Sequence, residues 1–142
     1  MATKHEMRIR ITVLHPPAGV VTKVQRGKDE LLAPSETTGD GLVFEFEVSV
    51  DNSGATPNFL GKYAQGPKDA RFVYVNSGTY AGQHITCWSR RAKISLMSIT
   101  REQIDAVLGG DKVLQTEYNG TGRDGGPTCA SVKGIEWKVI TK

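Results

Sequence analysis

The sequence has few of the features that mark membrane proteins, disulfide-stabilised domains or metal sites. No apolar run approaches the roughly 20 residues of a membrane-spanning helix. The two cysteines, Cys87 and Cys129, make a poor disulfide framework, and with three scattered histidines they lack the paired spacing of a zinc site. No secretory leader is recognisable at the start. We therefore expect a cytoplasmic protein with both cysteines as thiols, no metal, no cofactor and no membrane association.

Aromatic side chains and net charge are also modest. Aromatics amount to 7% of the chain, and 18 basic residues against 15 acidic ones leave a net charge of +3. Nucleic-acid-binding domains usually carry a denser basic stripe, so the composition argues against that class of partner. The length suits a single domain over residues 1–142, and residues 1–6 are expected to be a loose leader before the first strand.

The sequence is richer in glycine and in alternating apolar residues. Its 16 glycines separate many short stretches in which apolar and polar residues alternate, which is the period of a half-buried strand. We expect strands over residues 7–13, 20–25, 30–33, 42–51, 71–75, 85–97, 113–118, 129–132 and 135–140. Residues 51–66 are expected to be irregular and residues 78–82 to be a turn. This pattern predicts a mainly β fold, either a small antiparallel β-barrel or a sandwich.

Two of the expected strands carry opposite charges on their polar faces. One presents Arg8 and Arg10, and the other presents Glu45 and Glu47. If the two strands are neighbours, cross-strand ion pairs would help to fix their register. Each exposed pair contributes only about 0.2–1 kcal/mol, so the charges predict which strands pair more than how stable the fold is.

One short helix is predicted over residues 100–108. Thr100 and Gln103 have the spacing of a capping box, in which each side chain accepts a hydrogen bond from the other residue's backbone amide. Ile99 and Ile104 bracket this box at the spacing of a hydrophobic staple. A helix of about two turns is too short to be stable alone, so it is expected to pack on the sheet.

Several stretches, taken together, resemble a family of bacterial domains of unknown function. They are residues 58–63 (NFLGKY), 69–76 (DARFVYVN), 89–96 (SRRAKISL), 126–132 (GPTCASV) and 135–137 (IEW). Their order and spacing match over nearly the whole chain. Trp88 and Ser89 stand just before the paired arginines, where the family's usual pattern is more aromatic or aliphatic. The resemblance implies a bacterial, cytoplasmic, single-domain protein. It implies no particular activity, because none is established for the family.

Arg90 and Arg91 are the most prominent candidates for a functional site. On a regular strand Arg90 shares the apolar face, and an inward arginine must be paired or must line a polar pocket. A guanidinium in such a pocket would bind phosphate or carboxylate. We therefore predict a non-enzymatic binding domain for an anionic small molecule, with Arg71, Arg90 and Arg91 as anion contacts and Phe59 and Tyr63 as the pocket wall. A structural ion pair, or a bulge that turns Arg90 outward, explains the same pattern without a ligand.

An enzyme is the alternative class, although the sequence predicts no catalytic residue. A cysteine nucleophile would use Cys87 or Cys129 with His84 or His15 as its base. Cysteines at strand positions are more often small buried hydrophobes. The two glutamates of the acidic strand would serve as general acid and base, but a solvated strand face is the simpler account of them.

Binding of single-stranded nucleic acid is a further alternative. Trp88, Tyr74, Tyr80 and Arg71 combine rings with positive charge, as such sites do. Most aromatic residues fall at positions expected to face the core, however, which argues against this function. A homo-oligomer that completes the burial of its apolar strand faces is also compatible with the pattern, which does not fix the number of chains.

Overall fold

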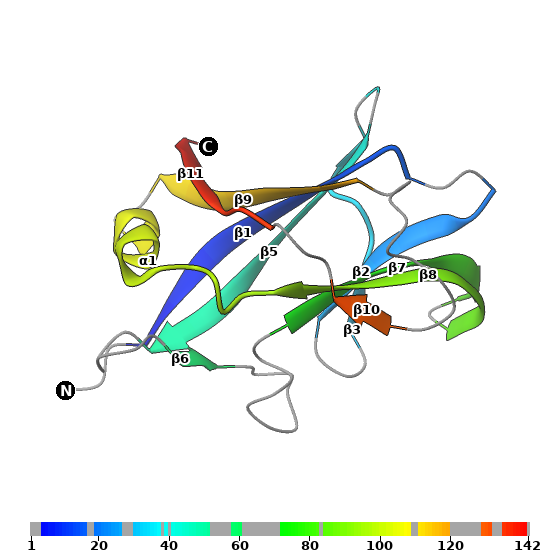
Figure 1. Ribbon diagram of the computed structural model, residues 1–142, viewed down its shortest axis with the longest axis horizontal. Helices are drawn as coiled ribbons and strands as arrows, with labels where there is room; N and C mark the ends of the chain where they lie inside the picture. The colour runs from blue at the N-terminus through cyan, green and yellow to red at the C-terminus, as the bar shows by residue number, and fades with distance from the viewer. Residues whose placement is uncertain are drawn as a thin grey trace.

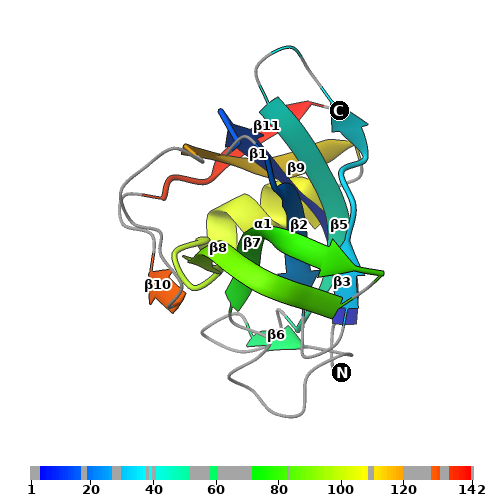
Figure 2. The same ribbon diagram turned by 90° about the vertical axis from the view of Figure 1, so that its right-hand side faces the viewer.

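The computed structural model describes residues 4–16, 19–26, 30–37, 39, 41–51, 58–60, 72–82, 84–108, 111–119, 129–131 and 135–141. Within these ranges the chain forms two β-sheets that face each other, with one short helix between them at one end (Figures 1 and 2). The prediction of a mainly β fold with one helix is confirmed. No helix in the described ranges is both long enough and apolar enough to cross a membrane.

The chain passes several times between the two sheets, so each sheet combines strands from distant parts of the sequence. Sheet A has the order β11-β9-β1-β5-β4, with β6 also paired to β5. Its strands are β1 (Lys4–Leu14), β4 (Glu36–Thr37), β5 (Gly41–Asp51), β6 (Asn58–Leu60), β9 (Lys112–Asn119) and β11 (Lys138–Thr141). Sheet B has the order β10-β8-β7-β2-β3. Its strands are β2 (Val21–Arg26), β3 (Glu30–Leu32), β7 (Phe72–Ala81), β8 (His84–Ser95) and β10 (Cys129–Ser131).

Of the two predicted architectures, the sandwich is the one that the structure supports. Among the described strands no hydrogen-bonded pairing joins sheet A to sheet B, so the sheets are not closed into a barrel. The expectation of an antiparallel arrangement is wrong at two places, because β1 pairs with β9, and β10 with β8, in parallel. Parallel neighbours need a long crossover connection, which residue patterns within single strands do not reveal.

Several expected boundaries also change. Lys4, His5 and Glu6 pair with β5, so they belong to β1 and not to a loose leader. The turn expected at residues 78–82 is reduced to its end, because β7 continues through Ala81 before the positive-φ Gly82. The stretch expected to be irregular after β5 contains the short β6. Residues 135–137 precede β11 and are not part of it.

The core lies between the sheets and is filled by the alternate residues of their inner faces. Sheet A contributes the fully buried Ile9 and Ile11 of β1, and sheet B contributes Val75 of β7 and Ile94 of β8. On β5, Phe44, Phe46 and Val50 are buried, and Val48 is half-buried. The strict alternation seen in the sequence thus decides which face of each strand enters the core.

Helix α1 (Arg101–Leu108) packs against β1, β9 and β11. Its capping box is confirmed, because the Thr100 amide donates to Gln103 Oε1 at 2.9 Å and the Gln103 amide donates to Thr100 Oγ1 at 3.2 Å. Ile99 and Ile104 are both buried, as expected for the staple. The Gln103 amide group also donates to the Trp137 carbonyl at 2.6 Å, which ties the helix to the segment before β11.

The ends of β1 and β5 approach each other closely at Gly41. A Cβ atom at this position would lie 2.5 Å from the carbonyl oxygen of Val13, which is far inside van der Waals contact. Leu14 pairs with Gly41 in the register of the two strands. Only glycine fits here without moving the backbone of β1.

Candidate functional site

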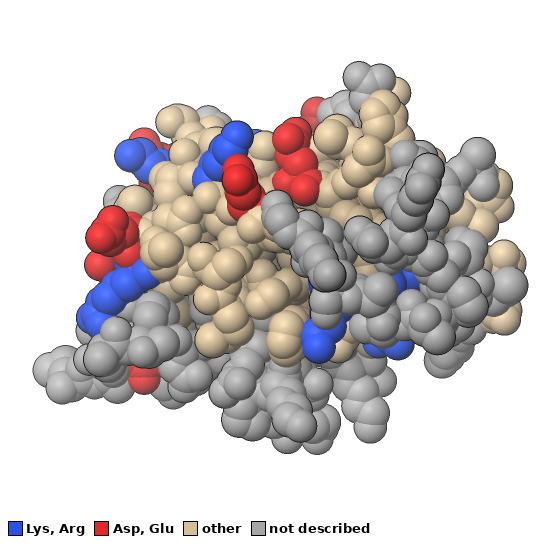
Figure 3. Space-filling model, viewed as in Figure 1, with Lys and Arg blue, Asp and Glu red and all other residues tan. Residues whose placement is uncertain are grey.

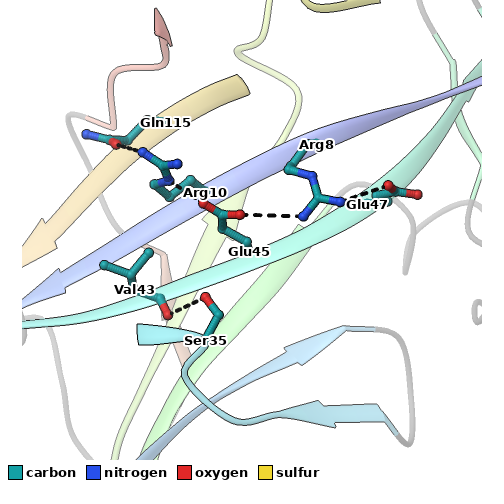
Figure 4. A network of polar contacts seen from close by, with 7 residues as sticks. All are labelled: Arg8, Arg10, Ser35, Val43, Glu45, Glu47 and Gln115. Atoms are coloured by element: carbon teal, nitrogen blue, oxygen red, sulfur yellow. Dashed lines mark hydrogen bonds and ion pairs between the residues drawn. The ribbon is translucent and has the colours of Figure 1, made fainter. Parts of the chain in front are cut away.

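The outer face of sheet A carries a network of matched charges (Figure 4). The predicted pairing is confirmed, because Arg8 stands opposite Glu47 and Arg10 opposite Glu45 in the β1–β5 register. Arg10 Nε donates to Glu45 Oε2 at 2.6 Å, and the Arg8 guanidinium bridges Glu45 at 3.4 Å and Glu47 at 3.1 Å. Gln115 on β9 accepts from Arg10 at 3.4 Å. Both glutamates therefore serve as acceptors for arginines, which supports the structural account of them.

The outer face of sheet B has a different composition. Val24 of β2, Val73 and Val75 of β7 and Ala92 and Ile94 of β8 are buried on the inner face. The residues between them alternate outward and are half-buried. We call the following set the cationic face: Lys23, Phe72, Tyr74, Tyr80, Arg91 and Lys93. Among the described side chains of this sheet's outer face there is no carboxylate.

Each basic side chain of the cationic face lies over an aromatic ring of β7. Lys93 Nζ is 3.8 Å from the ring centre of Phe72, and Arg91 Cζ is 4.4 Å from that of Tyr74. Lys23 Nζ reaches the ring of Tyr80 from the other side of β7, at 4.7 Å. Contacts of this kind stabilise by about 0.5–1 kcal/mol at exposed sites.

Two of these contacts repeat with the same diagonal offset. Lys93 is registered opposite Tyr74 but lies over Phe72, and Arg91 is registered opposite Asn76 but lies over Tyr74. Diagonal neighbours on one face of an antiparallel pair are within reach of long side chains. The result is a repeating unit of one cation and one ring, with a step of two residues along the strand.

Amide side chains lie at the centre of the cationic face. Asn76 is fully buried although it belongs to the outer face, and its Nδ2 donates to Gln25 Oε1 at 2.8 Å. Its Oδ1 is also buried and accepts no hydrogen bond from the described residues. A buried amide of this kind keeps the layer beneath the cations polar.

The pKa of Tyr80 is shifted by its surroundings on the same face. Burial raises the pKa of its phenol above the usual value of 10.0, and the nearby Arg91 charge opposes that rise. The hydroxyl donates to the backbone carbonyl of Asn76 at 3.3 Å. Arg91 therefore acts on Tyr80 electrostatically as well as lying over Tyr74.

The structure places only one of the predicted ligand-binding side chains. Arg91 is part of the cationic face. Arg90 of β8 is registered opposite Ser77 of β7, next to a β-bulge between Ser77 and Gly78. Phe59 of β6 is registered opposite Val50 of β5. The side chains of Arg90 and Phe59 lie outside the described part, as do Tyr63 and Arg71 altogether. The predicted pocket of these five residues therefore stays a prediction.

Some of the residues considered for a cysteine active site also have side chains outside the described part of the structure. The side chains of His84, Cys87 and Cys129 are not among those described, whereas His15 is exposed at the end of β1 with a positive φ of 52°. Within the described ranges, no group of three or more His, Cys, Asp or Glu side chains is placed to hold a metal ion.

Lys23, Phe72 and Lys93 were not among the candidates identified from the sequence. Residues 71–75 were expected only to form a strand, and Val73 and Val75 are the described residues of that stretch that are buried. Phe72 and Tyr74 face outward and are covered by the cations of β8. The sequence did contain a pattern that could have identified these residues. Arg91 and Lys93 are two residues apart on β8, and Phe72 and Tyr74 are two residues apart on β7, so each pair shares one face of its strand.

Two surface hollows occur elsewhere in the molecule. One, of about 200 Å³, is lined by Gln115, Thr116, Glu117, Glu136 and Lys138 on the sheet A side. The other, of about 210 Å³, is lined by Glu6, Met7, Arg8, Glu47, Val107, Leu108 and Lys112. Both mix acidic and basic residues, so neither presents charge of one sign. Neither includes a residue of the cationic face.

The fold and this face define a β-sandwich-like domain with a positively charged, aromatic sheet surface. The chain belongs to a family of unknown function (DUF5990), whose match covers residues 7–140. The resemblance noted from the sequence is thus confirmed as membership of a family without an assigned function. No curated protein and no solved structure matches the chain.

Proposed function

We propose that this protein is a non-enzymatic binding domain that takes an anionic ligand on the cationic face of sheet B. The observation that carries the proposal is the grouping of Lys23, Arg91 and Lys93 on one sheet face, each over a ring of β7. The proposal keeps Arg91 as an anion contact, as expected from the sequence. It names Lys23 and Lys93 as the other anion contacts.

Charge composition supports this choice of face. Sheet A balances Arg8 and Arg10 with Glu45 and Glu47, so an incoming anion would compete with carboxylates there. The described outer side chains of sheet B add positive charge without carboxylates. In the space-filling view, red and blue atoms are mixed over the upper part, and further blue atoms are visible lower down, near β8 and β10 (Figure 3). Such a local excess of one sign attracts oppositely charged ligands.

The strength of the contacts also favours an anion. A hydrogen bond between an ionised donor and an ionised acceptor stabilises by about 1.5–3 kcal/mol, more than the roughly 0.5–1 kcal/mol of an exposed cation–ring contact. A phosphate or carboxylate would therefore draw Lys93 or Arg91 away from its ring. Because the rings hold the cations side by side beforehand, the ligand orders fewer side chains on binding.

The test is a thermal-melt screen at low salt with inorganic phosphate, sulfate, citrate and a nucleoside triphosphate. A ligand at 100 times its Kd stabilises the folded state by about 2.7 kcal/mol, which raises the Tm of a chain of this size by about 8 °C. We expect at least one of these anions to raise the Tm of the wild-type protein. Lys93→Gln and Arg91→Gln should reduce that rise.

The matched control is Lys138→Gln, which removes the same charge from an exposed position on the edge strand of sheet A. It should leave the anion-induced rise intact. The proposal fails if no anion shifts the Tm of the wild-type protein, or if Lys138→Gln weakens the response as much as Lys93→Gln does.

A further inference from the structure

Resting on the proposed anion site, we infer that the occupant of the cationic face is a single-stranded nucleic acid that runs along β7. The cationic face offers two kinds of contact at each step: a cation and the face of an aromatic ring. Lys93 with Phe72, and Arg91 with Tyr74, are two such steps side by side. Lys23 with Tyr80 adds a third on the opposite side of the strand.

A ligand that removes a cation from its ring leaves that ring bare. Inorganic phosphate would bind Lys93 and expose the face of Phe72 to water, so part of the gain would be lost. An uncharged aromatic ligand would cover Phe72 but displace the lysine without giving it a partner. A nucleotide carries both an anion and a planar ring, and it replaces both partners at once. Stacking of a base on an aromatic side chain contributes about 1–3 kcal/mol, which exceeds the contact that is given up.

The repeat of the face suits a polymer better than a single nucleotide. Phe72 and Tyr74 are two residues apart on one face of an extended strand, a separation of roughly 7 Å. Arg91 and Lys93 are separated by the same step on the neighbouring strand. A chain of nucleotides repeats its phosphate and base in the same way, so consecutive nucleotides would meet consecutive cation–ring units.

A double helix does not offer these groups. Its bases are stacked on each other and are not free to lie on Tyr74 or Phe72, whereas an unpaired strand can turn its bases outward onto protein rings. The sequence argued against nucleic acid because its basic excess is small and because most aromatic residues were expected to face the core. The second objection does not apply to Phe72, Tyr74 and Tyr80, which all lie on the outer face.

The experiment is fluorescence anisotropy at low salt with labelled oligothymidylate and oligouridylate. The comparison probes are a DNA duplex of the same length and inorganic polyphosphate, which carries the charge without bases. We expect the single strands to bind at least tenfold more tightly than either comparison probe. If three cations contact phosphates, the slope of log K against log salt should be about −2.

Two variants of one residue separate stacking from charge. Tyr74→Leu should weaken single-strand binding by about tenfold, in line with the loss of one stacked base. Tyr74→Phe keeps the ring and should bind as the wild-type protein does. An unchanged circular dichroism spectrum and an unchanged Tm without ligand should verify that Tyr74→Leu is folded.

The outcomes distinguish this inference from the proposed function. If single strands, duplex and polyphosphate bind equally and Tyr74→Leu changes none of them, the face is a general anion site, and only the nucleic-acid inference is overturned. If no probe binds and no small anion raises the Tm, both are overturned. Tight single-strand binding that depends on the ring of Tyr74 and on Lys93 supports both.

Discussion

The outer faces of the two sheets differ in how their long charged side chains are held. Both faces carry such side chains at positions that water can reach. Sheet A does this with arginines and glutamates that neutralise each other across β1 and β5. Sheet B does it with cations that lie on aromatic rings. The charges of sheet A are neutralised across the strand pair, which helps to fix its register, whereas the described cations of sheet B pack on rings that carry no opposite charge.

The largest effect should come from breaking the strand pair beneath the charge-paired face. Gly41→Ala places a methyl group against the Val13 carbonyl, so we expect it to lower the free energy of unfolding by about 3 kcal/mol. Urea denaturation measures the change. Gly39→Ala is the matched control, because a Cβ there meets no atom within 4 Å. Equal stability of the two variants would show that β1 and β5 do not approach as closely as described.

The second effect concerns the ion pairs of sheet A. Glu45 accepts from both Arg8 and Arg10, and its side chain is only 24% exposed, so Glu45→Ala should cost about 1–2 kcal/mol of stability. Glu36→Ala, on the exposed β4, serves as the control and should change stability by less than about 0.5 kcal/mol. A double-mutant cycle of Arg10 and Glu45 should give a coupling energy of about 1 kcal/mol. A coupling near zero would contradict a role in fixing the register.

The third effect tests the other side of the comparison. Lys93→Gln and Lys23→Gln should each lower stability by only about 0.5 kcal/mol, since each removes one exposed cation–ring contact. Chemical denaturation of both variants beside Glu45→Ala gives the ranking. If either lysine variant destabilises the protein more than Glu45→Ala, the cationic face is a structural element, and the contrast between the two sheets disappears.

The smallest effect is the titration of Tyr80. Its folded pKa is raised above 10.0, so the neutral phenol stabilises the fold below pH 10.0, and this contribution is lost as the pH rises through the folded pKa. Ultraviolet absorbance of tyrosinate should show one tyrosine, absent in Tyr80→Phe, that ionises late. Arg91→Gln removes the charge that opposes the rise, so it should raise this pKa further. A lower pKa in Arg91→Gln would show that Arg91 does not act on Tyr80.

Much of sheet A was predictable from local pattern. Ile9 and Ile11 alternate with Arg8 and Arg10, and this alternation alone assigned the two faces of β1. The opposite charges at Glu45 and Glu47 were a hint that β5 is its neighbour, and the register of the two strands confirms it. The capping box at Thr100 was equally local, since its two hydrogen bonds join residues three apart. Interactions of this kind depend on period and spacing, which a single chain displays directly.

The cationic face was not predictable in the same way. Tyr74 and Lys93 come from the consecutive strands β7 and β8, whereas Lys23 comes from β2, which is far from both in the chain, and their grouping depends on the order β8-β7-β2 in sheet B. From the sequence, Arg90 was a candidate because it shares the apolar face of a regular strand, whereas Arg91 falls on the opposite face. Only the pairing of β7 with β8 identifies Arg91 as the one that meets Tyr74.

Local pattern was enough to establish that this protein is mainly β, which residues of β1 and β5 enter the core, and where the helix begins, because each of these follows from the order of polar and apolar residues along one segment. The sandwich with its two parallel strand pairs, and the meeting of three cations with three rings on one face, follow only from the assembled fold. These features arise from contacts between different strands, most of which are distant in sequence. Their partners are chosen by strand order and register, which no single segment encodes.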